Sequence, residues 1–337
     1  MRVLSALSVM ILAMFATCDA FAINSKAETR EVLRDLMAWL PGEYSSAPQI
    51  FYEREAGAPP DGEHENFYRV FAKIDAPQLG ENVIYTQIRI GGKDGPIFSG
   101  QQVLFLITVD DEHRAVTVSG RRIADPDKFE DAHLHPEMWA AIAPDPDYGG
   151  NCDFRWRKHG DQIVGKLTDG KSDTTCTMIS KRSGTQYTWD AEWILNDHEL
   201  WIFDNGYLDD GSLFSGRADR THLRMYKSRP FECFAAYRPQ NGEPQVFNGI
   251  AMHDRGDVHA IEIKGIEGPV YMQLMRSMWP SESGKNYADL LRLDVFQGEP
   301  ETSLDDRKLI GFSWASADSD RTGFDIGTWG ARCKLAK

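Results

Sequence analysis

The sequence predicts an all-β protein, in which a large antiparallel β-barrel or sandwich is followed by a second, small β-sandwich-like domain. Short segments rich in Val, Ile, Phe, Tyr and Thr recur along the chain, as is typical of strands. Clusters of Gly, Pro and Asp separate these segments at the spacing of turns. The 337 residues also exceed the length at which a single hydrophobic core usually stops growing, which favours two domains.

The first domain is predicted over residues 28–228. Apolar residues recur at helical spacing over 28–40, and Pro41-Gly42 ends this helix. A second short helix is predicted over 129–142, before Pro144. The other periodic segments predict about ten or eleven strands, which in closed form would leave no exposed sheet edge. They are residues 43–45, 67–74, 82–90, 101–109, 115–122, 152–159, 162–168, 174–182, 186–195, 199–205 and 222–227.

A second strand-rich stretch follows Pro230 and defines the predicted C-terminal domain, residues 229–337. Its length and its roughly seven strands are typical of a small antiparallel sandwich. The expected strands are residues 231–237, 246–253, 258–264, 269–279, 290–297, 308–315 and 323–334.

The N-terminus predicts a signal peptide over residues 1–22. Arg2 precedes an uncharged, mostly apolar stretch, and the small residues around Ala22 indicate the cleavage point. The apolar run of about 15 residues is shorter than the ~20 needed to span a bilayer. We therefore expect a secreted or periplasmic protein without a membrane span, and favour this over a lipoprotein anchored through Cys18.

Net charge and cysteine content restrict the classes of binding partner and the cellular compartment that we expect. A formal net charge of -14 argues against nucleic acid as a partner. Four cysteines follow the signal peptide, and an oxidising compartment would pair them in one of three ways. We expect Cys152–Cys176 and Cys233–Cys333, because each pair then lies within one predicted domain; a zinc site is not expected without a Cys-x-x-Cys pair.

No established catalytic signature occurs, so no residue is assigned a catalytic role. His133 and His135 could bind a metal from an extended segment, but their neighbours suit an exposed loop. The acidic segments 204–211 and 318–320 miss the spacing of an EF-hand and are predicted to be solvated turns. No metal site is therefore expected.

The segment 186–195 carries the most informative pattern. Alternation places Tyr187, Trp189, Ala191 and Trp193 on one face of a strand and Glu192 on the other. In a barrel one of these faces lines the interior, where aromatic rings could hold a flat hydrophobic ligand beside a carboxylate. The alternative is that the aromatic side chains simply fill the core.

Several motifs, in this order, resemble those of the CpcT/CpeT-type chromophore lyases. Residues 36–49 are similar to the opening of that family, with a Trp-bearing helix, a Gly-x-Tyr step and Gln49. Further similar segments include the family's Gly-Cys and Tyr-x-x-Ser-Glu motifs. These segments are Ile84-Tyr85-Thr86-Gln87, Asn151-Cys152-Asp153, Ile163-Val164-Gly165-Lys166-Leu167 before Cys176, Tyr187-Thr188-Trp189-Asp190-Ala191-Glu192 and Phe203-Asp204-Asn205-Gly206.

The resemblance covers roughly residues 30–228 and implies a calycin-like or lipocalin-like barrel. Members of the family bind an open-chain tetrapyrrole, a bilin, and attach it to a cysteine of a phycobiliprotein subunit. The resemblance implies that Tyr187, Glu192, Tyr85 and Gln87 contact the ligand, and the strand alternation adds Trp189 and Trp193 to this set.

The chain lacks arginines that the family carries in two of its motifs. The family's Tyr-Arg-x-Arg is replaced by Ser99-Gly100-Gln101-Gln102, and its Asp-Arg-Gly by Asp204-Asn205-Gly206. We therefore expect a barrel that binds a hydrophobic small molecule, a bilin by resemblance, without assigning lyase activity. Two alternatives stay open: a non-catalytic carrier of another lipophilic molecule, and a structural or interaction protein with a filled barrel.

Overall fold

The computed structural model of the protein describes residues 25–59, 62–98, 100–147, 152–169, 175–180, 183–280, 287–298 and 307–336. The predicted signal peptide, Cys18 included, lies outside these residues. Among the described helices, none has the length and apolar character needed to cross a lipid bilayer.

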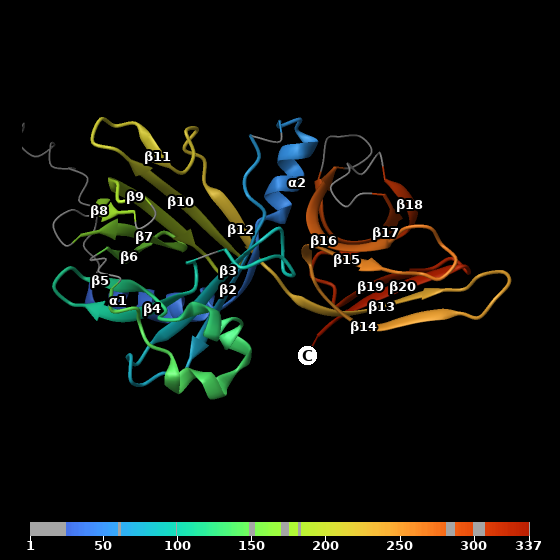
Figure 1. The fold of residues 1–337 in the computed structure, drawn as a ribbon, viewed down its shortest axis with the longest axis horizontal. Coiled ribbons are helices and arrows are strands. Elements are labelled where there is room, and N and C mark those ends of the chain that lie inside the picture. The colour runs from blue at the N-terminus through green and yellow to red at the C-terminus, as the bar shows by residue number, and fades with distance from the viewer. Residues whose placement is uncertain are drawn as a thin grey trace, which may run out of the picture.

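Ten antiparallel strands of the N-terminal part close into a barrel (Figure 1). Each strand pairs with the next from β1 to β7, then β7 pairs with β9, β9 with β10, β10 with β12, and β12 with β1. Strands β8 and β11 extend the sheet beside β9 and β10. The strands are β1 (Gly42–Ser45), β2 (Phe67–Ile74), β3 (Val83–Ile90), β4 (Val103–Asp110), β5 (Ala115–Arg122), β6 (Asp153–His159), β7 (Gln162–Thr168), β8 (Thr175–Ile179), β9 (Gln186–Leu195), β10 (Glu199–Tyr207), β11 (Leu213–Ser215) and β12 (Leu223–Lys227).

Helix α1 (Lys26–Trp39) packs on the barrel core, close to the predicted range. Ser25 and Glu28 form a capping box that satisfies amide groups at its N-terminus. The apolar face of the helix buries Val32 and Leu36 completely, and both belong to the core cluster of the barrel strands. Burial of this face, rather than intrinsic propensity, supplies most of the stability of such a helix.

The helix predicted over residues 129–142 is wrong. The chain forms three short 3-10 helices there, η1 (Pro126–Phe129), η2 (Ala132–Leu134) and η3 (Pro136–Ala141). Asp131 has a left-handed backbone, with φ at 52°, and His135, before Pro136, lies outside the helical region with φ at -126° and ψ at 75°. A residue that precedes proline is disfavoured in the α-helical region, so one continuous helix cannot run through this segment.

The C-terminal part consists of two four-stranded antiparallel sheets, one ordered β14-β13-β20-β19 and the other β15-β16-β17-β18. Their facing sides share one hydrophobic core that includes Phe231, Met272 and Leu293. The segment predicted as a single strand over 323–334 forms two strands, separated by a turn at Gly327. The strands are β13 (Pro230–Tyr237), β14 (Gln245–His253), β15 (Arg255–Ile261), β16 (Val270–Pro280), β17 (Tyr287–Gln297), β18 (Lys308–Ser316), β19 (Arg321–Asp325) and β20 (Trp329–Leu335).

Helix α2 (Ala47–Glu55), which the sequence pattern did not predict, lies between the barrel and the C-terminal sheets (Figure 1). The Phe51 ring lies 5.5 Å from that of Trp279, measured between centroids. The backbone amide of Met278 donates to the Tyr52 hydroxyl at 2.7 Å. On the barrel wall the Tyr68 ring stacks on His253 at 5.3 Å. The two parts therefore touch through aromatic and polar contacts.

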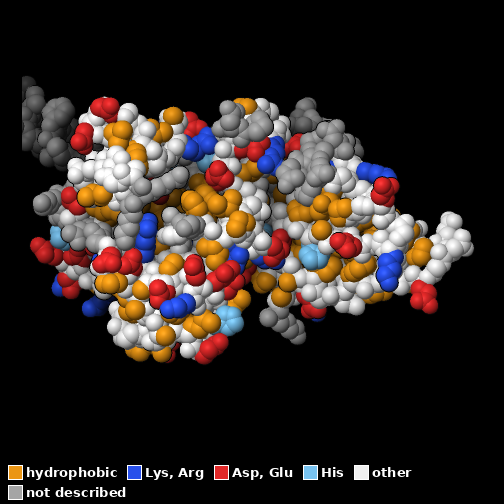
Figure 2. Space-filling view, in the orientation of Figure 1, with side chains coloured by type: hydrophobic (Ala, Val, Ile, Leu, Met, Phe, Trp, Pro, Cys, Tyr) orange, Lys and Arg blue, Asp and Glu red, His pale blue; other side chains and the backbone are white. Residues whose placement is uncertain are grey.

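The predicted all-β class, a calycin-like antiparallel barrel with a second, sandwich-like part, is confirmed. That residues 28–228 and 229–337 are separate domains stays a prediction. On the face seen in Figure 2, acidic and basic side chains are interspersed with hydrophobic ones.

Candidate functional site

The barrel holds a partly open cavity of about 710 Å³. Residues that alternate along the strands point into it, as the pleat of a β-strand requires. The lining combines apolar and aromatic side chains with many polar and charged ones, which include Glu63, His64, Glu65, Gln101, Asn205, Ser215, Arg217 and Thr221. Its principal members are Phe67, Arg69, Ile88, Val103, Phe105, Gly120, Arg122, Phe154, Met178, Tyr187, Trp189, Trp193, Ile202, Asp204, Leu223 and Met225.

Strand β9 contributes the aromatic wall that the sequence pattern predicted. Tyr187, Trp189 and Trp193 all line the cavity. The Trp193 ring is 5.2 Å from Phe154 and 5.8 Å from Phe105, measured between centroids. Trp193 is buried, and its Nε1–H has no acceptor among the described residues. Strand β9 thus contributes aromatic ring surface to the cavity wall.

Arg69, on β2, places a cation inside the barrel. Its side chain is 6% exposed, and its Nε donates to the Thr86 hydroxyl at 3.0 Å. The guanidinium carbon lies 4.6 Å from the Phe71 ring and 4.7 Å from the Trp193 ring, which are cation–π distances. Burial lowers the pKa of Arg69 to about 9, with the charge of nearby Asp204 acting in the opposite direction.

Asp204, on β10, is the acidic group of the cavity. Asp204 lines the cavity, and the residue as a whole is exposed, although many protein atoms lie around its carboxylate. The Nε1–H of Trp189 donates to its Oδ1. Burial raises the pKa of Asp204 to about 6, although the Trp189 hydrogen bond and the charge of Arg69 lower it. The turn predicted over residues 204–211 is wrong for 204–207, because β10 continues to Tyr207, and an exposed turn follows at residues 209–211.

We expect Asp204→Asn to change the pH dependence of the free energy of unfolding. In the unfolded chain this carboxyl ionises near its ordinary pKa of 3.8, whereas in the barrel it keeps its proton to about pH 6. Between these values the folded state binds more protons, so this group's contribution to stability falls as pH rises. We expect the free energy of unfolding of the variant, measured in urea, to rise relative to that of wild type as the pH increases from about 4 to about 7. A difference that does not change with pH contradicts this assignment.

Three of the residues expected to contact a ligand face away from the cavity. Glu192 alternates with the inward aromatic side chains, and its carboxylate lies 3.1 Å from the Lys166 ammonium on the outer wall. Tyr85 and Gln87 are fully buried beneath the 3-10 segment, where the Tyr85 hydroxyl donates to Gln87 Oε1 at 2.7 Å. The structure therefore brings Tyr187, Trp189 and Trp193 together, without Glu192, Tyr85 or Gln87.

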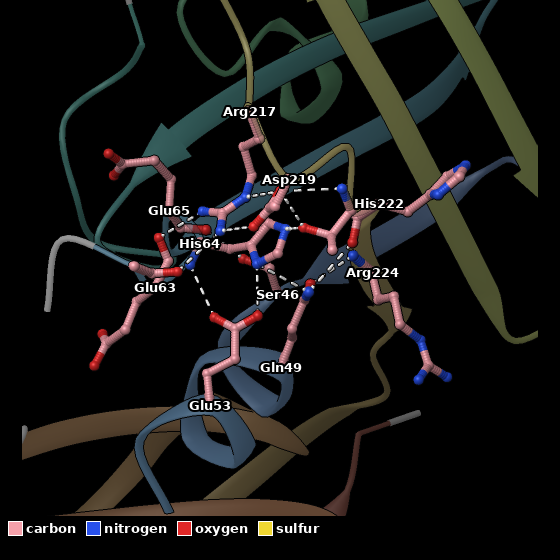
Figure 3. A network of polar contacts seen from close by, with 12 residues as sticks. Ser46, Gln49, Glu53, Glu63, His64, Glu65, Arg217, Asp219, His222 and Arg224 are labelled. Carbon is pink, nitrogen blue, oxygen red and sulfur yellow. Dashed lines mark hydrogen bonds and ion pairs between the residues drawn. The ribbon is translucent and has the colours of Figure 1, made fainter. Parts of the chain in front are cut away.

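A polar network joins three segments on one side of the cavity mouth: α2, residues 62–65 and residues 215–222 (Figure 3). His64 Nδ1 donates to Glu53 Oε1 at 2.5 Å, and its backbone amide donates to Oε2 at 2.8 Å. Arg217 donates to the backbone oxygens of Glu63 and Gly62 at 3.0 and 2.9 Å. Glu63, His64 and Arg217 line the cavity, so the network forms part of its wall.

Glu53, His64 and Thr221 are arranged like a catalytic relay, in which a carboxylate orients a histidine that activates a hydroxyl nucleophile. Thr221 Oγ1 lies 3.2 Å from His64 Nε2. The Thr221 hydroxyl, however, lies 2.8 Å from the Asp219 carboxylate. The Arg217 side chain holds the pKa of Asp219 well below its usual range, so this carboxylate can only accept. The hydroxyl proton therefore points to Asp219, and the arrangement holds the rim in place rather than activating a nucleophile.

Gln49, from the run that resembles the lyase family, has a positional role in the structure. Its Oε1 accepts from the backbone amide of Arg224 at 2.6 Å, and its Nε2 donates to the backbone oxygen of His222 at 3.2 Å. These bonds fix α2 to the start of β12. Gln49 thus supports the mouth without lining the cavity.

Both expected cysteine pairs are within bonding distance. Cys152 and Cys176 are joined beside the cavity, between the start of β6 and β8. Cys233 and Cys333 lie opposite each other on β13 and β20 and are joined there. Two such pairs are compatible with a secreted or periplasmic protein. In the described part of the chain no group of His, Cys, Asp and Glu side chains is arranged to hold a metal ion.

Arg69 and Arg122 were missed by reasoning from the sequence. The sequence does indicate Arg69, because Phe67, Arg69 and Phe71 alternate on one face of β2, and an arginine on an apolar face is unusual. Arg122 follows Gly120 on the inward face of β5. Both arginines line the cavity.

No family model matches the chain, and no curated protein matches it. Among solved structures, the chain is similar to the T-type phycobiliprotein lyase CpeT from Prochlorococcus phage P-HM1, with 14% identity and a TM-score of 0.32. That alignment covers 58% of this chain and 96% of the phage protein. The chain is also similar to the CRL protein of Arabidopsis, with 14% identity, a TM-score of 0.36, and coverage of 59% and 97%.

Proposed function

We propose that the barrel binds and carries a flat, conjugated hydrophobic molecule with polar groups, for which an open-chain tetrapyrrole is the best candidate. The observation that carries the proposal is the aromatic-walled cavity with Asp204 and Arg69 inside it. Its volume of about 710 Å³ lies within the range of about 300–1,000 Å³ usual for small-molecule sites.

Each chemical feature of the cavity has a counterpart in a bilin. Trp189 offers a ring against which a conjugated plane can stack. Asp204 offers a carboxylate that can accept from pyrrole N–H groups, and Arg69 offers donors for an acidic group. Attachment of the pigment to a phycobiliprotein cysteine is implied by the sequence resemblance alone and is no part of this proposal.

A second candidate is a carrier of another lipophilic acid. The specific observation in its favour is Arg69, whose buried cation suits the acid group of any apolar molecule of the right size. Such a ligand would occupy the same cavity, but it would not need N–H groups that donate hydrogen bonds to Asp204.

Titration of the protein with biliverdin or phycocyanobilin tests the proposal. We expect a red-shifted absorption band on binding, and a loss of affinity of about 10-fold or more in Asp204→Asn, since a hydrogen bond to a charged group contributes roughly 1.5–3 kcal/mol. Glu192→Gln is the matched control, because this carboxylate faces the outer wall and its loss should leave affinity unchanged.

The absence of a spectral change with both pigments, in protein shown to be folded by circular dichroism, contradicts bilin binding. Recovery of a lipophilic acid from the purified protein by solvent extraction would then favour the second candidate. Equal losses in the Asp204 and Glu192 variants would place the ligand outside the cavity.

A further inference from the structure

We infer that Arg69 binds a carboxylate group of the ligand inside the cavity. The inference rests on the proposed function and adds the chemical class of the ligand group that Arg69 holds. The carrying observation is a buried guanidinium that has no anionic partner.

Arg69 is 6% exposed and its one hydrogen bond in the described part of the chain runs from Nε to Thr86. The two terminal nitrogens of the guanidinium have no acceptor among the described residues, and no carboxylate there forms an ion pair with it. Buried charges in proteins are as a rule paired and fully hydrogen-bonded, because desolvation is costly. The unused donors of Arg69 thus mark the position of an acceptor that the chain does not supply.

The neighbouring groups do not supply this acceptor. The Asp204 carboxylate accepts from Trp189 Nε1 and acts on Arg69 only through its charge at a distance. The Phe71 and Trp193 rings contact the guanidinium through their faces, which leaves its N–H groups free to donate in the guanidinium plane.

These donors select a carboxylate over other anions. One planar guanidinium with two free nitrogens matches the two oxygens of a carboxylate. A phosphate dianion would carry twice the charge into a site that already holds the Asp204 carboxyl, which disfavours it. Phe71, Phe105 and Trp193 surround the cation with ring surfaces, so the atoms attached to the carboxylate must be apolar.

The experiment compares biliverdin with its dimethyl ester, which keeps the conjugated body and removes both negative charges. We expect wild-type protein to bind the free acid at least about 10-fold more tightly than the ester, as for other charge-assisted hydrogen bonds. In Arg69→Met this ratio should fall to about one, mainly through weaker binding of the acid. Arg69→Lys keeps the charge and should retain most of the preference.

Arg155→Met is the matched control, because Arg155 is also a buried arginine of the barrel, 9% exposed, but does not line the cavity. This variant should keep the wild-type preference for the acid. The wild-type ratio needs no variant, so the inference can be tested even if Arg69→Met does not fold.

The possible outcomes separate the inference from the proposed function. Equal wild-type affinity for acid and ester overturns the inference and leaves bilin binding in place. Binding of neither compound removes the proposed function itself for bilins. The same comparison with cis-parinaric acid and its methyl ester covers the second candidate: a preference for that acid, lost in Arg69→Met, supports the Arg69 site with a lipid acid as its occupant. A preference for either acid that persists in Arg69→Met overturns the inference.

Discussion

Replacement of both Cys233 and Cys333 by alanine should lower the free energy of unfolding of the C-terminal sheets by about 4–5 kcal/mol. The two residues are separated by 100 positions, and closing so long a loop removes much of the conformational entropy of the unfolded chain. Strands β13 and β20 hold the cysteines directly opposite each other, so the bond spans nearly the whole C-terminal part. A loss of this size approaches the total stability of a small domain.

Urea unfolding followed by fluorescence provides the measurement, with Trp329 as a reporter within this core. The matched control removes the Cys152–Cys176 pair, which has a separation of 24 and should contribute about 3 kcal/mol, in the barrel instead. Equal losses for the two double variants would contradict the chain-entropy argument. A single transition shared by both parts in every variant would contradict the proposed division into two domains.

The second large effect is expected from Gly120→Phe, which should strongly lower the affinity for the ligand without unfolding the barrel. Gly120 lines the cavity, and a Cβ added to it would meet only the Phe105 and Val103 side chains, at 3.8 Å. The backbone therefore accepts a side chain, while the new ring occupies space that a ligand needs. Losing the burial of a ring-sized part of the ligand costs about 2–3 kcal/mol, or roughly 30- to 150-fold in affinity.

Ser119→Phe is the control, because Ser119 precedes Gly120 on β5 and points to the other face of the sheet. Both variants should retain the wild-type circular dichroism spectrum, and only Gly120→Phe should lose the absorption change with biliverdin. Unchanged affinity in Gly120→Phe would mean that the ligand binds outside the barrel.

Gly165 illustrates why the same substitution has a different result elsewhere on the barrel wall. A Cβ at this residue would lie 2.5 Å from the Trp156 ring, which is buried and held by the surrounding core. The glycine is therefore required by close packing, whereas Gly120 is required only to keep space open.

Local patterns predicted the elements whose boundaries depend on neighbouring residues. The period of apolar residues located α1 and most strands, because a strand buried on one face must alternate. The same alternation predicted that Tyr187, Trp189 and Trp193 share one face of β9. The failures came where a tertiary contact decides the conformation, as in α2, which is stabilised by Phe51 against Trp279 and by Gln49 against β12.

The sequence by itself determined the all-β class, the aromatic face of β9 and the choice of cysteine partners, because these follow from residue period and spacing. Only the tertiary structure decided which face of each strand points into the cavity. Barrel closure turned Arg69 and Asp204 inward and Glu192 outward. The physical reason is that inside and outside are properties of the closed sheet as a whole, so no single strand carries the information that distinguishes them.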